Sequence, residues 1–407
     1  MSRIVLGVSG GIAAYKACEV IRRLRDAGHE VTVVPTRNAL EFVGATTFAA
    51  LSGRPVATDV FSDVETIPHV RIGREADLVV VAPATADLLA RAAAGRADDL
   101  LTNVLLTATC PVLVCPAMHT EMWGHAATVH NVATLRSRGV VVLDPAEGRL
   151  AGPDSGVGRL PEPEEIADVA LSLLDGRTAD TARTRDLLGL SVVVSAGGTH
   201  EALDPVRFIG NASSGRMGVA LARAAALRGA RVTLVAANLT VAVPSSVEVR
   251  TVSSTSELGA AMVDAAAGAD IVVMAAAPAD FTPVSPSGTK LKKSGSDGLV
   301  VELTQTSDIL AELSRTRAPR QTIVGFAAET IPDQAALVDA GRAKLARKGA
   351  DLLVLNDVTQ GKVFGLSDTT VMIVDAAGVR DKVTATKTVA AHRILDAVVS
   401  HRATASA

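Results

Sequence analysis

Residues 3–11 read RIVLGVSGG and residues 191–198 read SVVVSAGG, so an apolar run ends in a glycine pair at two places in the chain. Each run is followed by a helical pattern that ends at a glycine, and then by a second apolar run. A third apolar run is ADLVVVAPATAD at 76–87 in the first half and ADIVVMAAAPAD at 269–280 in the second. The two halves therefore repeat one layout.

Apolar runs that alternate with amphipathic helices predict a parallel sheet with helices on both faces and right-handed crossovers. The sequence thus predicts two doubly wound α/β domains, Rossmann-like or flavodoxin-like, with mainly parallel sheets. A length of 407 residues suits two domains. The polar stretch DGRTADTARTRDLLG at 175–189 has no strand character, so we place the domains at 1–176 and 190–407, with a linker at 177–189.

The composition limits the possible partners. A formal net charge of -3 and an aromatic content of 2% do not favour nucleic acid binding. No apolar run is long enough for a membrane span, and the first residues lack the pattern of a signal peptide, so we expect a cytoplasmic protein. Cys18, Cys110 and Cys115 form neither a disulfide framework nor a CxxC metal site.

The glycine pairs mark candidate ligand sites, because ligands of such sheets bind beyond the carboxyl ends of the strands. A glycine pair alone is equally consistent with a tight turn. A dinucleotide dehydrogenase is disfavoured, since neither half has a full GxGxxG motif. The second apolar runs also end at Thr36 and Asn238, without the acidic residue that would bind a ribose.

Three motifs of the N-terminal half would lie at one sheet edge: GGIAAYK at 10–16, PATAD at 83–87 and PAMHTEMW at 116–123. Together with AGRADDL at 94–100 they resemble the flavin-containing cysteine decarboxylases over residues 1 to about 175. The resemblance implies bound FMN. The implied FMN contacts are Ser9, Gly10, Gly11, Ile12, Thr36, Pro83, Ala84, Thr85 and Thr102.

The resemblance also implies a catalytic base. His69 precedes the predicted helix VRIGREA, where the family has its active-site histidine. A lone histidine is more often structural, but the matched context favours a role in the oxidation that precedes loss of CO2. The implied substrate contacts are Met118, His119, Met122 and Asp154, although the two methionines and Trp123 could equally be core residues.

Two positions depart from the family pattern. His119 stands where the family motif usually has Asn, a residue expected to hold the substrate carboxylate. Gly152 stands where relatives have the flap cysteine that protonates the reduced intermediate, so the sequence leaves the proton donor unassigned.

The C-terminal half has a polar, glycine-rich segment with GGT at 197–199, DPVRFI at 204–209 and NASSGRMG at 211–218. It contains no Gly-Lys-Ser/Thr, which excludes a P-loop. With AAAPADF at 275–281, KLKK at 290–293, SDIL at 307–310 and GFAAET at 325–330, it resembles phosphopantothenate-cysteine ligase over about 190–400. The chain as a whole thus resembles the bifunctional decarboxylase and ligase enzymes of coenzyme A biosynthesis.

The ligase resemblance implies activation of the pantothenate carboxylate by CTP, with Mg²⁺ accompanying the nucleotide. Asn211 and Lys290 are the implied catalytic residues, and Arg207 the implied substrate contact. The implied nucleotide contacts are Ala275, Ala276, Asp280, Lys290, Ser307, Asp308, Ile309, Leu310, Phe326, Lys344 and Lys348. The spacing of Lys344 and Lys348 would ordinarily mean a solvated helix face, and Asn211 could simply begin a helix. The sequence assigns no metal ligands.

Two alternatives stay open at this point. The missing flap cysteine permits an inactive or regulatory flavin domain beside an active ligase, or a non-catalytic binding protein. The retained His69 disfavours the first alternative, and the ligase motifs disfavour the second. The resemblance further implies a homo-oligomer, a dodecamer, and small-molecule substrates: phosphopantothenate, cysteine and CTP.

Overall fold

The computed structural model describes residues 1–58, 68–150, 152, 154–244, 246–292, 299–329, 333–357 and 368–406. By its internal contacts the chain divides into two units, Met1–Arg185 and Asp186–Ala407. The division falls inside the segment 177–189. Much of that segment is helical, because α9 (Gly176–Thr184) buries Ala179 and Ala182 in the first unit.

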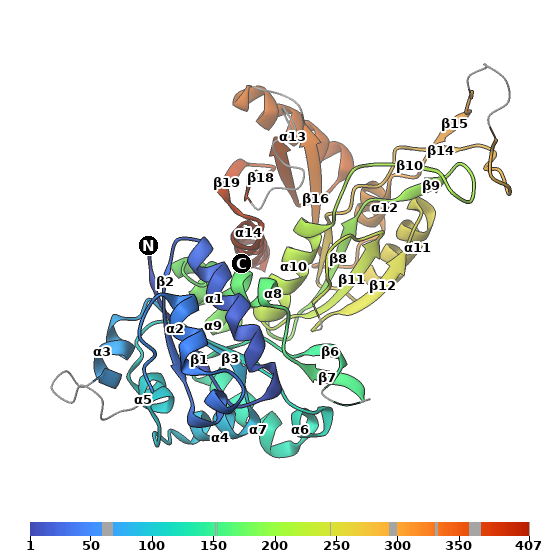
Figure 1. Cartoon of the computed structure of the whole chain (residues 1–407). Helices are drawn as coiled ribbons and strands as arrows, with labels where there is room; N and C mark the ends of the chain where they lie inside the picture. The colour runs from blue at the N-terminus through green and yellow to red at the C-terminus, as the bar shows by residue number, and fades with distance from the viewer. Residues whose placement is uncertain are drawn as a thin grey trace. The chain divides into compact units, whose positions relative to one another are not determined.

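The first unit contains a five-stranded parallel sheet in the order β2-β1-β3-β4-β5, of which Figure 1 labels β1, β2 and β3. Its strands are β1 (Arg3–Val8), β2 (Glu30–Pro35), β3 (Leu78–Ala84), β4 (Val112–Pro116) and β5 (Val141–Val142). The strand order reverses between β1 and β3, so this unit has its topological switch point there. The predicted flavodoxin-like class is confirmed for this half.

Helices cover both faces of this sheet, because its strands are apolar on both sides. On one face Val5, Val79 and Val81 pack against α4 (Ala86–Ala94), α5 (Leu100–Thr107) and α7 (Ala126–Ser137). The alternate strand residues face the other way, where α1 (Ala17–Asp26) contacts α8 (Pro163–Ser172). The remaining elements are η1 (Ile12–Lys16), η2 (Arg37–Glu41), α2 (Ala45–Ser52), α3 (Pro68–Glu75), α6 (Thr120–Gly124), β6 (Ala146–Arg149) and β7 (Ser155–Arg159).

The second unit contains an eight-stranded sheet in the order β12-β11-β8-β13-β16-β17-β18-β19. The strands are β8 (Ser191–Gly197), β11 (Arg231–Ala237), β12 (Glu248–Val252), β13 (Ile271–Met274), β16 (Thr322–Glu329), β17 (Leu352–Asp357), β18 (Asp368–Asp375) and β19 (Gly378–Thr386). The first six are parallel and follow the Rossmann order 3-2-1-4-5-6, while β18 and β19 are antiparallel. The switch point lies between β8 and β13, and the predicted fold class is confirmed.

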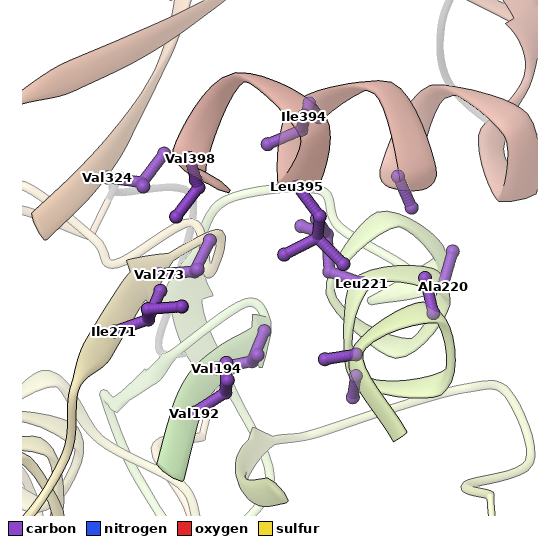
Figure 2. Close-up of a cluster of buried hydrophobic side chains, with 14 of the residues drawn as sticks. Val192, Val194, Ala220, Leu221, Ile271, Val273, Val324, Ile394, Leu395 and Val398 are labelled. Carbon is purple, nitrogen blue, oxygen red and sulfur yellow. The ribbon is translucent and has the colours of Figure 1, made fainter. Parts of the chain in front are cut away.

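One face of this sheet is covered by α10 (Arg216–Leu227) and α14 (Lys387–Ser406). Figure 2 shows Leu395 of α14 beside Leu221 of α10, and Val398 of α14 near Val273 of β13 and Val324 of β16. The other face is covered by α11 (Thr255–Ala266), α12 (Ile309–Thr316) and α13 (Gln334–Lys348). Two short ribbons complete the unit, β9 (His200–Ala202) with β10 (Phe208–Gly210) and β14 (Phe281–Pro283) with β15 (Leu303–Gln305).

A buried cation fastens α10 to α14. The fully buried Arg228 donates from Nε and Nη2 to Asp186 at 2.8 and 2.6 Å. Its Nη1 donates to Asp396 Oδ1 at 2.8 Å and to the carbonyl oxygen of His392 at 2.9 Å. A buried charge is costly unless it is paired, so the partners of Arg228 hold the end of α10 against α14 within the second unit.

Candidate functional site

In the first unit, Ser9 bridges the switch point between β1 and β3. Its Oγ donates to the carbonyl oxygen of Pro83 at 2.8 Å and accepts from the Thr85 amide at 2.9 Å. The Ser9 amide also donates to Pro83, at 3.2 Å. The Ser9 hydroxyl, 1% exposed, therefore holds the two loops together, and the predicted contacts Ser9 and Pro83 to Thr85 lie side by side.

The glycine pair after β1 has one tight and one open member. A Cβ on Gly10 would lie 2.4 Å from Asn38 Cβ, so this residue lets the loop pack against η2. A Cβ on Gly11 would meet only Thr85 Cγ2, at 3.8 Å. Ile12, 63% exposed, begins η1, and Thr36 caps η2 by accepting from the Ala39 amide at 3.3 Å.

The loop after β4 joins the same edge. The Ala117 amide donates to Ala84 at 3.0 Å, and the Met118 amide donates to Gly158 of β7 at 2.9 Å. A Cβ on Gly158 would lie only 2.1 Å from the Met118 carbonyl oxygen, so β7 packs directly against this loop. Met118 is partly buried against the core of the unit, as is Trp123.

The neighbouring helix α6 carries the more exposed predicted contacts. Met122 is 48% exposed, and His119 Nδ1 lies 3.8 Å from Glu121 Oε2. The hydroxyl of Thr120 is buried without a hydrogen-bond partner, and it faces Gly156 of β7, whose Cβ would lie 2.4 Å away. Thr120 was not singled out in the sequence, and only its orphaned hydroxyl makes it notable.

Gly152, where the resemblance predicts a flap cysteine, lies in the connection between β6 and β7. The Leu150 amide donates to the Asp154 carbonyl oxygen at 2.9 Å, and Arg149 Nε donates to the Gly152 carbonyl oxygen at 3.3 Å. The three cysteines lie elsewhere: Cys18 on α1, Cys110 before β4 and Cys115 on β4. Burial raises the pKa of each of these thiols, most of all that of the fully buried Cys115.

Two further predicted residues of this half are His69 on α3 and Thr102 on α5. His69 falls within the first turn of α3 rather than before it, and its carbonyl oxygen accepts from Thr107 Oγ1 of α5 at 3.0 Å. Its Nδ1 is buried without a hydrogen-bond partner. The Thr102 hydroxyl bonds Asp99 Oδ1 at 2.7 Å in the capping box of α5, and Thr102 lines a separate groove of about 280 Å³ with Cys110.

In the second unit, hydroxyl and amide side chains bridge the equivalent switch point. The Ala279 amide donates to Thr199 Oγ1 at 2.8 Å, and the Ala276 amide donates to Ser195 Oγ at 3.0 Å. Asn211 Nδ2 donates to the Pro278 carbonyl oxygen at 2.8 Å. The loop after β8 is thereby tied to the loop after β13.

A cleft of about 940 Å³ opens at this edge. It is lined by residues 211–217 before and within α10, residues 274–281 after β13, residues 305–310 at the start of α12, and residues 326–328 of β16. The predicted residues that it brings together are Asn211, Ala275, Ala276, Asp280, Ser307, Asp308, Ile309, Leu310, Phe326, Lys344 and Lys348. Lys387, which also lines the cleft, was missed; its only signal is a lysine at the start of the last helical pattern.

The charged side chains of the cleft are not independent of one another. Lys348 Nζ forms an ion pair with Asp308 Oδ2, and Asp308 also caps α12 by accepting from the Ala311 amide at 3.1 Å. Burial opposes ionisation of Asp308, but the hydrogen bonds from Lys348 and Ala311 hold its pKa below the usual range. Asp308, which the ligase resemblance implies as a nucleotide contact, thus positions the ammonium group of Lys348.

Arg207 and Lys290 are not among the residues that line the cleft. Arg207 Nε donates to Asp204 Oδ2 at 3.0 Å, and this carboxylate also accepts from the Leu291 amide at 3.0 Å. Burial raises the pKa of Asp204, but the amides of Val206, Leu291 and Arg207 outweigh it and lower that pKa to about 2. Asp204 therefore anchors the segment that carries Lys290 beside Arg207.

The described residues contain no group of three or more His, Cys, Asp or Glu side chains arranged to hold a metal ion. Among their helices, none has the length and apolar character needed to cross a membrane.

Comparisons with known proteins agree with the two-unit architecture. The family model described as Flavoprotein matches residues 1–175, and that described as DNA/pantothenate metabolism flavoprotein C-terminal domain matches residues 187–401. The coenzyme A biosynthesis bifunctional protein CoaBC of Mycobacterium tuberculosis is 55% identical over 405 residues, covering 98% of this chain and 96% of the relative. That of Escherichia coli is 41% identical over 362 residues, covering 88% and 86%.

Among solved structures, the C-terminal domain of a coenzyme A biosynthesis bifunctional protein matches at 30% identity and a TM-score of 0.44, covering 53% of this chain and 97% of that chain. The identities to the full-length relatives extend across both units. The chain therefore belongs to the family of coenzyme A biosynthesis bifunctional proteins, enzymes that combine a flavoprotein decarboxylase domain with a ligase domain.

Proposed function

We propose that the second unit joins cysteine to phosphopantothenate at the expense of CTP, and that the first unit then removes the cysteine carboxyl group with FMN. The observation that carries the proposal is the cleft of the second unit, which gathers residues from four separate motifs at the switch point of a Rossmann sheet. Both reactions would take place in the cytoplasm, on small molecules.

Ligation needs an activated acid, because a carboxylate is a poor electrophile. The phosphopantothenate carboxylate would attack the α-phosphate of CTP, pyrophosphate would leave, and the cysteine amine would displace CMP from the acyl cytidylate. Lys344 and Lys348 would stabilise the charge that develops on the phosphates. Ser307 to Leu310 and Phe326 would contact the nucleoside, and Ala275, Ala276 and Asp280 the rest of the nucleotide.

The remaining ligase residues lie at the margins of this arrangement. Asn211, already fixed by its bond to Pro278, would hydrogen-bond the acyl cytidylate. Lys290 would stabilise the same intermediate and Arg207 would contact the phosphorylated acid, from the segment that Asp204 anchors. Asp280 and Asp308 are the acids of the described cleft lining, and Asp308 is already paired with Lys348. Mg²⁺ would therefore be bound mainly by the nucleotide phosphates and enter the cleft with them.

The residues of the first unit fit FMN. Gly11 leaves open space beside the Ser9 to Ile12 loop, and the loop is made rigid by Ser9 and Thr85. The backbone N–H groups of residues 10–12, together with Thr36, would bind the phosphate of FMN and an edge of the flavin. When bound, FMN would supply the two-electron oxidation and re-reduction that allow a cysteine amide to lose CO2. Thr102 contacts Asp99 and lines a different groove, which makes it the weakest member of the proposed set.

The catalytic side chain of the first unit would be His69. Its buried Nδ1 has no hydrogen-bond partner in the structure, as expected of an imidazole that meets its partner in a ligand complex. Met118, Met122, His119 and Asp154 would contact the substrate from the β4 loop, α6 and the flap. A homo-oligomer, a dodecamer, is the proposed assembly, and native mass spectrometry tests it.

Product analysis tests both activities at once. The purified chain is mixed with phosphopantothenate, cysteine and Mg²⁺, with or without CTP, and the products are identified by mass spectrometry. Phosphopantetheine that forms only with CTP supports the proposal. Accumulation of phosphopantothenoylcysteine would favour the second candidate, an inactive or regulatory flavin domain, for which Gly152 in the flap is the supporting observation. Absence of both products would overturn the proposal.

A further inference from the structure

The cleft of the second unit has a basic residue that none of the ligase motifs contains. Lys387 lines it together with Lys344, Lys348 and Arg216, so basic side chains reach the cleft from α10, α13 and α14. Asp280 and Asp308 are the acidic side chains of the described lining, and Asp308 is engaged by Lys348. Four basic residues against two acidic ones leave an excess of positive charge, which suits an anionic ligand.

The position of Lys387 at the start of its helix also favours an anionic ligand in the cleft. It is the first residue of α14, where the helix dipole disfavours a cation, and the first turn of α14 contains no acidic residue. The cleft-lining end of α10 is alike, since it begins with Arg216, has no acid in its first turn and lacks a side-chain cap at Gly215. The first turns of α11 and of the cleft-lining α12 do contain an acid, Glu257 and Glu312 respectively. The helix dipoles therefore do not favour these two cations, whereas an anion in the cleft would stabilise them.

We infer that Lys387 binds a phosphate group of a ligand in this cleft. The inference rests on the proposed function, which brings two phosphorylated compounds to the second unit. The phosphate is either part of the nucleotide triphosphate or the terminal phosphate of the phosphorylated acid. Both present the same oxygen anions to an ammonium group.

Equilibrium binding to the full-length chain separates the sources. Isothermal titration calorimetry in the presence of Mg²⁺ compares the wild type with Lys387→Ala, Lys387→Arg and the control Lys382→Ala. Lys382 is an exposed lysine of β19 that bonds Gln334 and does not line the cleft. The titrants are CTP, phosphopantothenate and inorganic triphosphate, the last of which binds independently of any base.

We expect Lys387→Ala to weaken binding about tenfold or more for the compound whose phosphate it contacts. Lys387→Arg should restore most of that loss because it keeps the charge, and Lys382→Ala should bind like the wild type. A loss for CTP and inorganic triphosphate assigns Lys387 to the triphosphate, and a loss for phosphopantothenate alone assigns it to the acid.

Three results would overturn the inference. The first is unchanged affinity of Lys387→Ala for every titrant that the wild type binds. The second is a loss that Lys387→Arg does not restore and that comes with a lower unfolding midpoint of the ligand-free chain, which would mean a structural role. The third is a wild type that binds none of the titrants, which would overturn the proposed ligase function as well; a wild type that binds inorganic triphosphate but not CTP would overturn only the choice of nucleotide.

Discussion

In both units a side-chain hydroxyl joins the two loops that meet at the switch point of the sheet. In the first, the hydroxyl of Ser9 accepts from the Thr85 amide at 2.9 Å, and in the second, the hydroxyl of Thr199 accepts from the Ala279 amide at 2.8 Å. In both cases a loop after the first strand of the unit is fastened to the loop across the switch point. A doubly wound sheet divides there, and a hydroxyl can both donate and accept to hold the edges together.

The units differ in the stretch of chain between the glycine pair and the next helix. In the first unit the chain enters η1 at Ile12, directly after Gly11. In the second it forms β9 and β10 and reaches α10 only at Arg216. This longer connection supplies residues 211–217, one wall of the 940 Å³ cleft. The comparison shows that one sheet plan can carry first loops of different length, and that the longer loop forms part of a cleft.

The largest expected effect would separate the two chemistries. Substituting the proposed base, His69→Gln, should lower phosphopantetheine formation by about 100- to 10,000-fold, because a positioned general base contributes that much. Ligation should continue, so phosphopantothenoylcysteine should accumulate in product analysis by mass spectrometry. His130→Gln, an exposed histidine of α7, is the control and should leave both products unchanged. Full decarboxylation by His69→Gln would remove His69 from the mechanism.

The buried cluster of the second unit predicts a difference in stability. Arg228→Met leaves Asp186 and Asp396 without their shared cation and should lower the free energy of unfolding of this unit by about 3–5 kcal/mol. Lys16→Met in the first unit should cost less, since its partner Glu162 is half-exposed and can be solvated.

Urea unfolding can follow the two units separately. The only Trp of the chain, Trp123, lies in the first unit, so its fluorescence reports that unit, while circular dichroism reports both. Equal losses of unfolding free energy for Arg228→Met and Lys16→Met would show that the two buried cations contribute equally to stability. That result would contradict the predicted difference between the units.

A third prediction compares the two glycine loops. Gly197 has a φ of +90°, and a Cβ there would lie 1.8 Å from the Ala237 carbonyl oxygen, whereas Gly11 is extended and has open space. Gly197→Ala should therefore destabilise the second unit by about 1–3 kcal/mol or more. Gly11→Ala should stay within about 0.5 kcal/mol of the wild type. The same urea experiment measures both, and a Gly197→Ala variant as stable as Gly11→Ala would contradict this account.

The smallest expected effect is a dependence of stability on pH in the second unit. The pKa of Asp204 in the folded chain is about 2, below its value of about 3.9 in an unfolded chain, so its ionised form stabilises the fold. That contribution is complete above about pH 4 and is lost as the pH falls toward 2. Thermal unfolding of the wild type between these values should lose more stability than that of Asp204→Asn.

The control for this titration is Asp339→Asn, an exposed position of α13 that should keep the pH dependence of the wild type. A wild type and an Asp204→Asn variant with the same slope would show that this carboxylate does not anchor the segment at Leu291.

Much of the local structure could be predicted from the order of the residues alone. Apolar runs predicted β1, β2 and β3 of the first sheet and β8, β11 and β13 of the second, and the polar residues after those strands predicted which side chains would meet at the carboxyl edges. The motifs that contain Asn211, Asp280 and Phe326 predicted one site for these residues, and they line one cleft. Such predictions succeed because the period of the apolar residues and the strand ends are properties of neighbouring residues.

The pairing of side chains that are distant in the sequence became visible only in the folded chain. It showed that Lys348 is engaged by Asp308, that Lys387 reaches the cleft from the last helix, and that Thr102 lines a groove whose lining does not include Ser9. It also decided the two strand orders, which place the switch points. These features depend on how helices pack across a sheet, between residues tens to more than a hundred positions apart, and no local period in the sequence encodes such a contact.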